Sequence, residues 1–330
     1  MYELIRKTLI IILCLMLSKM LHVTVSVYIV LFSIVIATTC DSCHIWEIIK
    51  RILPSLFAAF GAVLINQLFA SHPFIIWACS IIYFDYVRRK VNSNMKARAV
   101  TLPLFIIIFI DTYATSTSYT LLIPDIIRDL VLSTLITALV ASFINHIMPI
   151  KHTMPIPTIV SMPVTGADRL KVLLLVGLGL AFIMINEVTS AVFCLVPLIT
   201  SAMQPTNDLM KTHSRNKMLS QVGGCSLAIV VSLIFSGTEI NFFTYLSVST
   251  ILVFTILWWC NHPDKEEGLI HSDALMGFLI PYQLYIGQYG NNFGLNSIIL
   301  RAFELTVVLL IIYTVAYWLE RLATKSTKLN

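Results

Sequence analysis

Charged residues are scarce in this sequence. Only 12% of its 330 residues are Asp, Glu, Lys or Arg, whereas a soluble domain carries about 25%. So little charge cannot cover a water-facing surface, and 58% of the residues are hydrophobic and come in long runs. The solvent for most of the chain is therefore expected to be lipid. We predict an all-α, multi-pass membrane protein with the lipid bilayer as its main partner.

Signatures of catalysis are absent too. The sequence contains no G-x-S-x-G, no H-E-x-x-H and no Walker A pattern. No soluble segment is long enough to fold as a separate catalytic domain. We therefore expect a protein that is not an enzyme, with no catalytic residue and no cofactor. The net charge of +5 is scattered in small groups between apolar runs, which is typical of membrane-protein loops and not of a nucleic-acid-binding surface.

Cysteines are few, and their spacing implies no disulfide framework. Cys40, Cys43 and His44 match C-x-x-C-H, the c-type haem attachment pattern. Haem attachment occurs on the oxidising side of a membrane, but the basic residues that follow favour the cytoplasmic side. A metal or redox role is a second reading, although no further cysteine pair completes a zinc site. We favour a plain loop and expect no metal.

Runs of apolar residues predict about 12 transmembrane helices, with ten or eleven as alternatives because several runs are short. The predicted spans are 7–22, 24–39, 52–70, 73–88, 99–119, 121–147, 170–186, 188–204, 217–236, 241–260, 273–289 and 296–319.

The basic residues predict the orientation. With the N-terminus inside, all of the 22 Lys and Arg residues except Lys19, Arg128 and Arg301 fall in cytoplasmic segments. Such an asymmetry places both termini in the cytoplasm. The inner membrane of a bacterial cell is the expected location.

Features recur in the same order in two halves. Lys7 and Lys171 each open an apolar run. Arg51 lies 44 residues after Lys7, and Arg215 lies 44 residues after Lys171. An even number of helices in each half makes the repeats parallel. The expected organisation is a first transmembrane repeat at 1–147, a Pro-rich cytoplasmic linker at 148–169 and a second repeat at 170–330.

The fifth predicted helix of each half is short and interrupted. Apolar residues 99–110 contain Pro103 and give way to a polar run beginning at Asp111, while 274–287 contain Pro281 and are followed by Gln288. Polar groups at membrane depth survive only inside protein or beside water. Interrupted segments at matching places in two repeats point to a transport site; the alternative is that both helices end early.

Ionisable and aromatic residues near these segments are the candidate site. Asp111 lies roughly 20 Å along its helix from Arg98, and Arg128 lies at similar depth after the next turn. We expect Asp111 and Arg128 to pair and to couple proton movement, with Asp125 and Asp129 on the same turn as Arg128. The alternative is permanent ion pairing that only holds helices together. The expected substrate path comprises Tyr113, Tyr282, Gln283, Arg301 and Glu304. For Arg301 and Glu304, an intrahelical ion pair near the outer interface is an equal alternative.

Two stretches resemble a known family. Tyr28–Thr39 lead to Arg51, and Val188–Gln204 lead to the run from Arg215 to Gly224, so that each half has a helix, a cytoplasmic loop and a basic residue opening a small-residue helix. This order resembles the fusaric acid resistance and aromatic acid exporter superfamily, in particular its short bacterial members without a large cytoplasmic domain. The first half departs from the pattern, because Pro54 begins the stretch where a Gly-rich turn is expected.

The resemblance implies proton-driven efflux of organic or aromatic acids, often with a periplasmic membrane-fusion adaptor. We therefore expect a secondary transporter of small organic compounds, with homo-oligomers left open. A non-transporting membrane scaffold is the second hypothesis.

Overall fold

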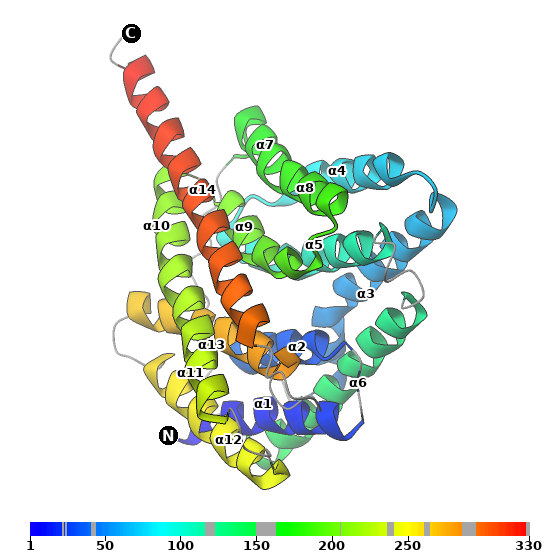
Figure 1. The fold of residues 1–330 in the computed structure, drawn as a ribbon, viewed down its shortest axis with the longest axis vertical. Helices are drawn as coiled ribbons and strands as arrows, with labels where there is room; N and C mark the ends of the chain where they lie inside the picture. Colours follow the sequence, from blue (N-terminus) through cyan, green and yellow to red (C-terminus); the bar gives the residue numbers. More distant parts are fainter. Residues whose placement is uncertain are drawn as a thin grey trace. The chain divides into compact units, whose positions relative to one another are not determined.

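The computed structural model describes residues 1–21, 23, 25–40, 44–115, 123–149, 163–204, 206–235, 241–260, 265–285 and 295–327. Every regular element in these ranges is a helix (Figure 1). The expected all-α class is thereby confirmed. The first six helices are α1 (Tyr2–Met20), α2 (Val27–Thr39), α3 (Ile45–Leu68), α4 (Pro73–Lys90), α5 (Asn94–Thr115) and α6 (Ile123–Ile147).

The second part of the chain is more finely divided. One continuous helical stretch comprises α7 (Gly166–Val172), the π-helical turn η2 (Leu173–Gly177) and α8 (Leu178–Asn186). A 3-10 turn, η3 (Thr189–Cys194), leads into α9 (Leu195–Ala202), and α10 (Asn207–Lys217) continues through the π-helical turn η4 (Met218–Val222) into α11 (Gly223–Phe235). The last three helices are α12 (Phe242–Cys260), α13 (Lys265–Tyr285) and α14 (Leu295–Thr327).

Five helical stretches are long and apolar enough to cross a membrane. They are Ile45–Leu68, Pro124–Ile147, Asn207–Phe235, Phe242–Cys260 and Leu295–Trp318. Three shorter apolar helices accompany them: Val27–Thr39, Ala99–Thr115 and Ala191–Ala202. These helices indicate a multi-pass membrane protein. The count of 12 spans, the cytoplasmic termini and the two repeats stay predictions.

The fifth predicted helix of the first half is continuous through the interrupted segment at Asp111. α5 continues through Asp111 to Thr115, and Pro103 lies inside it. In the same way Pro281 lies inside α13. A proline removes one backbone donor, but neighbouring helices and hydroxyl side chains can satisfy the freed carbonyl, which is why membrane helices tolerate it. Asp111 is therefore a helical residue and not the start of a loop.

The chain divides into two compact units, each assembled from separate segments. Unit 1 contains Met1–Pro54, Asp125–Ile156 and Leu219–Ala302, and unit 2 contains Ser55–Pro124, Pro157–Met218 and Phe303–Asn330. Neither unit coincides with one of the predicted repeats. Each combines helices from both halves of the sequence.

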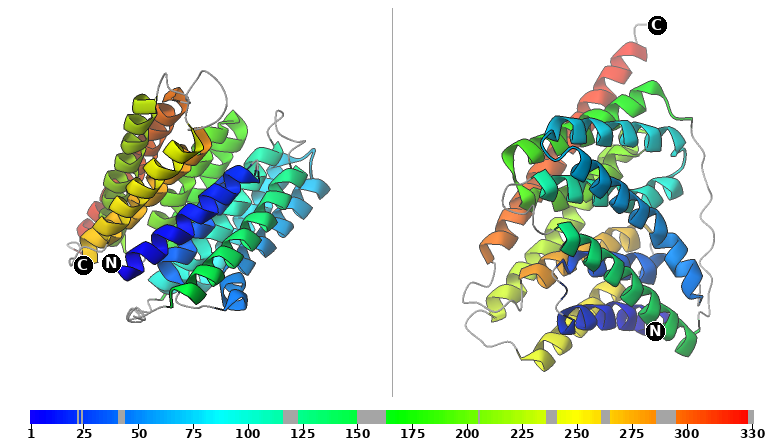
Figure 2. Two further views of the ribbon diagram at one scale, coloured as in Figure 1. Left: turned by 90° about the horizontal axis from the view of Figure 1, so that it is seen from below. Right: turned by 90° about the vertical axis from the view of Figure 1, so that its right-hand side faces the viewer.

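In unit 1 two N-terminal helices pack among three that come much later in the chain. α1 packs against α2 and α12, α2 packs against α13, and α13 also contacts α11 and α12. Figure 2 (left) shows α1 running alongside α12. The Arg6 guanidinium also donates a 2.6 Å hydrogen bond to the Asn145 amide oxygen, which ties α1 to α6.

Unit 2 has a comparable arrangement with the halves exchanged. α4 packs against α5, α7 and η2, and α5 packs against α8 and α9. The Trp77 indole on α4 donates a 2.9 Å hydrogen bond to the carbonyl of Gly177, the last residue of the π-helical turn. A π-helical turn alters the regular backbone pairing, and here a side chain from the neighbouring helix binds one of its carbonyls.

Two glycines bring α11 and α13 into close contact. A Cβ atom added to Gly224 would lie 2.5 Å from the Ala274 carbonyl oxygen, and one added to Gly277 would lie 2.6 Å from the Gln221 carbonyl oxygen. Small residues allow membrane helices to approach backbone to backbone. The close contact requires glycine at position 224 but not at the neighbouring position 223, because a Cβ on Gly223 would meet nothing within 4 Å.

We predict that Gly224→Ala destabilises the protein while Gly223→Ala does not. Overpacking against backbone costs about 1–3 kcal/mol, whereas alanine in an exposed helix position gains up to about 1 kcal/mol over glycine. Thermal unfolding of the two variants in the same detergent checks this. Equal melting temperatures would show that α11 and α13 can separate without cost.

Candidate functional site

Asp111 lies at the centre of a small polar group inside unit 2. Its side chain is on α5 and the residue is only 1% exposed. The Ser80 hydroxyl on α4 donates to one carboxylate oxygen at 2.5 Å, and the Asn66 amide on α3 donates to the other at 2.7 Å. We call Asn66, Ser80 and Asp111 the Asp111 centre. Three helices thus meet at one carboxylate.

The donors to Asp111 are neutral. Within the part of the chain that the structure describes, no basic side chain bonds or pairs with the carboxylate. Asn66 also donates to the Ala62 carbonyl at 2.9 Å, and its own amide oxygen is buried without a hydrogen-bond partner among the described residues. A buried carboxylate without a counter-charge is costly. Such a group becomes stable by taking up a proton or a cation.

Arg128 and its neighbours form a separate cluster in unit 1. Arg128 contacts Asp125 at 2.9 Å and Asp129 at 2.9 Å. Asp129 is fully buried, and its second oxygen accepts a 2.8 Å hydrogen bond from the Val25 backbone amide just before α2. This geometry suits a structural ion pair that also anchors the start of α2.

The expected pairing of Asp111 with Arg128 joins residues of different units. Asp111 receives its hydrogen bonds inside unit 2, and Arg128 binds its two aspartates inside unit 1. The pairing stays a prediction. The sequence placed the two residues at similar depth but could not identify Asn66 and Ser80 as donors to Asp111.

A second polar group occupies unit 1. The Tyr245 hydroxyl on α12 donates to the Gln283 side-chain oxygen on α13 at 2.6 Å. Ser249 Oγ on α12 lies 2.9 Å from the Tyr282 hydroxyl, and the rings of Tyr245 and Tyr282 stack at 5.1 Å. We call Tyr245, Ser249, Tyr282 and Gln283 the Tyr282 centre. The place of Tyr282 and Gln283 in a substrate path stays a prediction.

The contacts of Lys19 account for one of the three basic residues that fall outside the predicted cytoplasmic segments. Its ammonium group on α1 lies 5.7 Å from the centre of the Tyr245 ring and 3.3 Å from the Gln283 carbonyl oxygen. A cation over an aromatic face and beside a carbonyl is stabilised without facing water. The sequence alone left Lys19 unaccounted for.

The remaining candidate residues belong to neither centre as defined here. Tyr113 stacks on Phe109 with ring centres 4.4 Å apart. Arg301 on α14 is 3% exposed and hydrogen-bonds the Cys225 sulfur on α11, while Glu304, one turn later, is half-buried. Their roles in a substrate path stay predictions.

The C-x-x-C-H pattern is only partly described. Cys40 is buried with a free thiol and His44 is exposed, while Cys43 lies outside the described residues. Among the described residues no group of three or more His, Cys, Asp or Glu side chains is placed to hold a metal ion. The haem, metal and loop readings therefore stay open.

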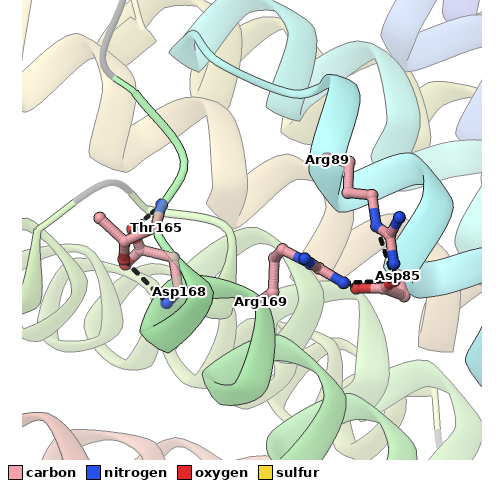
Figure 3. A network of polar contacts seen from close by, with 5 residues as sticks. All are labelled: Asp85, Arg89, Thr165, Asp168 and Arg169. Atoms are coloured by element: carbon pink, nitrogen blue, oxygen red, sulfur yellow. Dashed lines mark hydrogen bonds and ion pairs between the residues drawn. The ribbon is translucent and has the colours of Figure 1, made fainter.

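An ionic cluster joins α4 to α7 in unit 2 (Figure 3). Asp85 pairs with Arg169 at 2.7 Å and with Arg89 at 2.6 Å. Just before Arg169 in the chain, Thr165 and Asp168 cap the start of α7. The Thr165 hydroxyl accepts from the Asp168 amide at 3.2 Å, and the Asp168 carboxylate accepts from the Thr165 amide at 3.1 Å. Reciprocal bonds of this kind define a capping box.

The capping box makes the start of α7 sensitive to acid. Burial alone would raise the pKa of Asp168, but hydrogen bonds from Thr165 and the charges of Lys171 and Arg88 together hold that pKa below its usual value. A carboxyl whose pKa is lower in the folded state stabilises the fold above its unfolded pKa of about 3.9. That contribution is lost as the pH falls below this value.

We predict that Asp168→Asn lowers stability at neutral pH and reduces its loss below about pH 4. Thr165→Ala should cost about 1 kcal/mol, and the double variant should cost less than the sum because each residue caps through the other. Thermal unfolding across a pH series measures these effects. Strict additivity would show that the two caps act independently.

The fold and this buried centre define a class: a multi-pass helical membrane protein with an acidic side chain enclosed by neutral donors. Residues 3–144 match a family described as a protein of unknown function, DUF2955. The matched segment is less than half of the chain and runs from α1 almost to the end of α6. No curated protein and no solved structure matches the chain.

Proposed function

We propose that this chain is a secondary transporter of the bacterial inner membrane that exports small organic compounds in exchange for protons. The observation that carries the proposal is the Asp111 centre. A transporter that uses a proton gradient needs a group that binds and releases a proton within the membrane. Asp111 is a buried carboxylate on an apolar helix, and its described partners are neutral.

The geometry of the centre suits both protonation states. When Asp111 is charged, Ser80 and Asn66 each donate a hydrogen bond to it. When Asp111 is protonated, its own O–H can donate to the Ser80 oxygen, because a hydroxyl both donates and accepts. Neither state leaves the carboxyl without a partner. A permanent ion pair would lack this property, because it would keep the carboxylate charged.

The substrate class rests on the resemblance of the sequence to aromatic acid exporters. Aromatic or other small organic acids are the proposed cargo, and a periplasmic membrane-fusion adaptor is the proposed partner. Unlike the carriers that work alone, an adaptor-linked carrier would release its cargo into a partner channel. Assembly into homo-oligomers belongs to the same proposal.

We predict that Asp111→Asn abolishes proton-driven export while leaving the protein folded. Asparagine keeps the shape of the protonated side chain, with an oxygen that can accept from Asn66 and an NH2 group that can donate to the Ser80 oxygen, but it cannot titrate. Proteoliposomes loaded with radiolabelled aromatic carboxylates, beginning with benzoate, measure efflux after an imposed pH gradient. The rate of the variant should fall to that of protein-free vesicles.

Asp208→Asn on α10 is the matched control, because Asp208 is exposed and belongs to neither polar centre. It should export at the wild-type rate. Full gradient-dependent export by Asp111→Asn would exclude Asp111 as the coupling group. If wild-type protein moves none of the carboxylates, the scaffold hypothesis is favoured, and deletion of the gene should then disrupt a membrane assembly.

A further inference from the structure

The two polar centres occupy matching places in the two units. Ser80 is the eighth residue of α4, and Ser249 is the eighth residue of α12. Each serine is buried and bonds to a side chain near the C-terminal end of the next helix, Asp111 on α5 or Tyr282 on α13. The serine is the shared element, and the group that it bonds differs.

The helices around the centres also pack in the same order. In unit 1, α12 and α13 pack against each other and against α1 and α2. In unit 2, α4 and α5 pack against each other, α4 packs against α7, and α5 packs against α9. In both cases two helices that open one predicted repeat pack on the fourth and fifth helices of the other. The match of the two serines is therefore part of a larger correspondence.

We infer that, among the residues that the structure describes, Asp111 is the one buried carboxyl that takes up and releases a proton, and that Tyr282 fills the equivalent position of the other unit as a neutral group. The inference rests on the proposed function and deepens it by fixing the number of coupling sites. The step is a simple proton transfer: the carboxylate of Asp111 gains one proton from water and later returns it to water.

The charged groups around Asp111 are bound elsewhere. On α4 the nearest charged residues lie further towards the C-terminal end. Asp85 pairs with Arg169 and Arg89, and Arg88 donates to the Val91 carbonyl. α8, η3 and α9 contain no acidic or basic residue, and α3 carries its charged residues near its start, well before Asn66. On α5 itself Lys96 and Arg98 lie 15 and 13 residues before Asp111, near the start of the helix, and Lys96 bonds to Asn92. Among the described side chains, the partners of Asp111 are therefore neutral.

The Tyr282 centre already has a cation beside it. Lys19 lies over the Tyr245 ring and beside the Gln283 carbonyl. A carboxylate at position 282 would lie near this ammonium group and would be held in its charged form. A tyrosine hydroxyl can bond to Ser249 without responding to pH in the physiological range. The two centres thus fit different roles. The Asp111 carboxyl of unit 2 can take up and release a proton, whereas Tyr282 of unit 1 keeps its hydrogen bond to Ser249.

Two other buried or half-buried carboxyls must be distinguished from Asp111. Asp129 is buried, but unlike Asp111 it is bound by a basic side chain, Arg128, and by the Val25 amide. Glu304 is half-buried on α14. Asp129 and Glu304 each need their own variant in the test.

The test measures carboxyl protonation directly, in full-length protein in lipid, by infrared difference spectroscopy across a pH series. A protonated, buried carboxylic acid gives a C=O band separate from the backbone amide bands. Wild-type protein should show one such band, and Asp111→Asn should remove it. Glu304→Gln and Asp129→Asn should leave it in place.

Matched serine variants test the correspondence between the units. Ser80→Ala removes a donor to the charged carboxylate, so the pH at which half of the band appears should rise by about one unit. Ser249→Ala removes the equivalent hydroxyl of unit 1 and should not move that midpoint. Ser80→Thr keeps the hydroxyl and should restore the wild-type midpoint, which separates loss of the donor from general damage to the fold.

Several results would overturn the inference. A band that persists in Asp111→Asn, a second titrating band in wild-type protein, or an equal shift in Ser80→Ala and Ser249→Ala would each exclude a single site at Asp111. These outcomes are independent of transport. If Asp111→Asn still exports, the proposed coupling role fails, although wild-type protein can still show a single titrating band. If wild-type protein shows a second band, the inference fails even where export depends on Asp111.

Discussion

Buried polar groups inside apolar helices must satisfy one another, because lipid offers no hydrogen bonds. The hydrogen bonds from Asn66 and Ser80 to Asp111 are the sharpest case, since they stabilise a carboxylate that no described basic residue contacts. The same requirement is met differently at Asp129, where an arginine and a backbone amide bind the carboxylate. One carboxylate is therefore suited to structure and the other to a change of protonation.

The requirement also shapes how the helices are arranged. Donors and acceptors come from helices far apart in the sequence: Arg6 binds Asn145, Lys19 reaches Gln283, and Trp77 binds Gly177. Each unit therefore needs segments from both halves of the chain. The close contact of α11 and α13 at Gly224 adds a packing requirement that only glycine meets.

The proposed coupling group and the ionic cluster of α4 and α7 lie in the same unit. Asp111 on α5 is bound to α4 through Ser80, and α4 is bound to α7 through Asp85 and Arg169. α4 thus contributes one residue to the Asp111 centre and another to the ionic cluster with α7. A proton arriving at Asp111 would alter the hydrogen bonding in the middle of α4, a helix that ion pairs fix near its C-terminal end.

Composition and apolar runs determined the all-α class and the multi-pass character, because lipid solvent imposes them on any chain with so few charges. They also singled out Asp111, since an acidic residue in an apolar run stands out. Tertiary structure alone decided what surrounds it. Asn66 and Ser80 are unremarkable in the sequence, and the partners of Lys19 depend on helices that meet only after folding. Hydrogen-bond partners more than 30 residues apart follow from packing, which local sequence patterns do not encode.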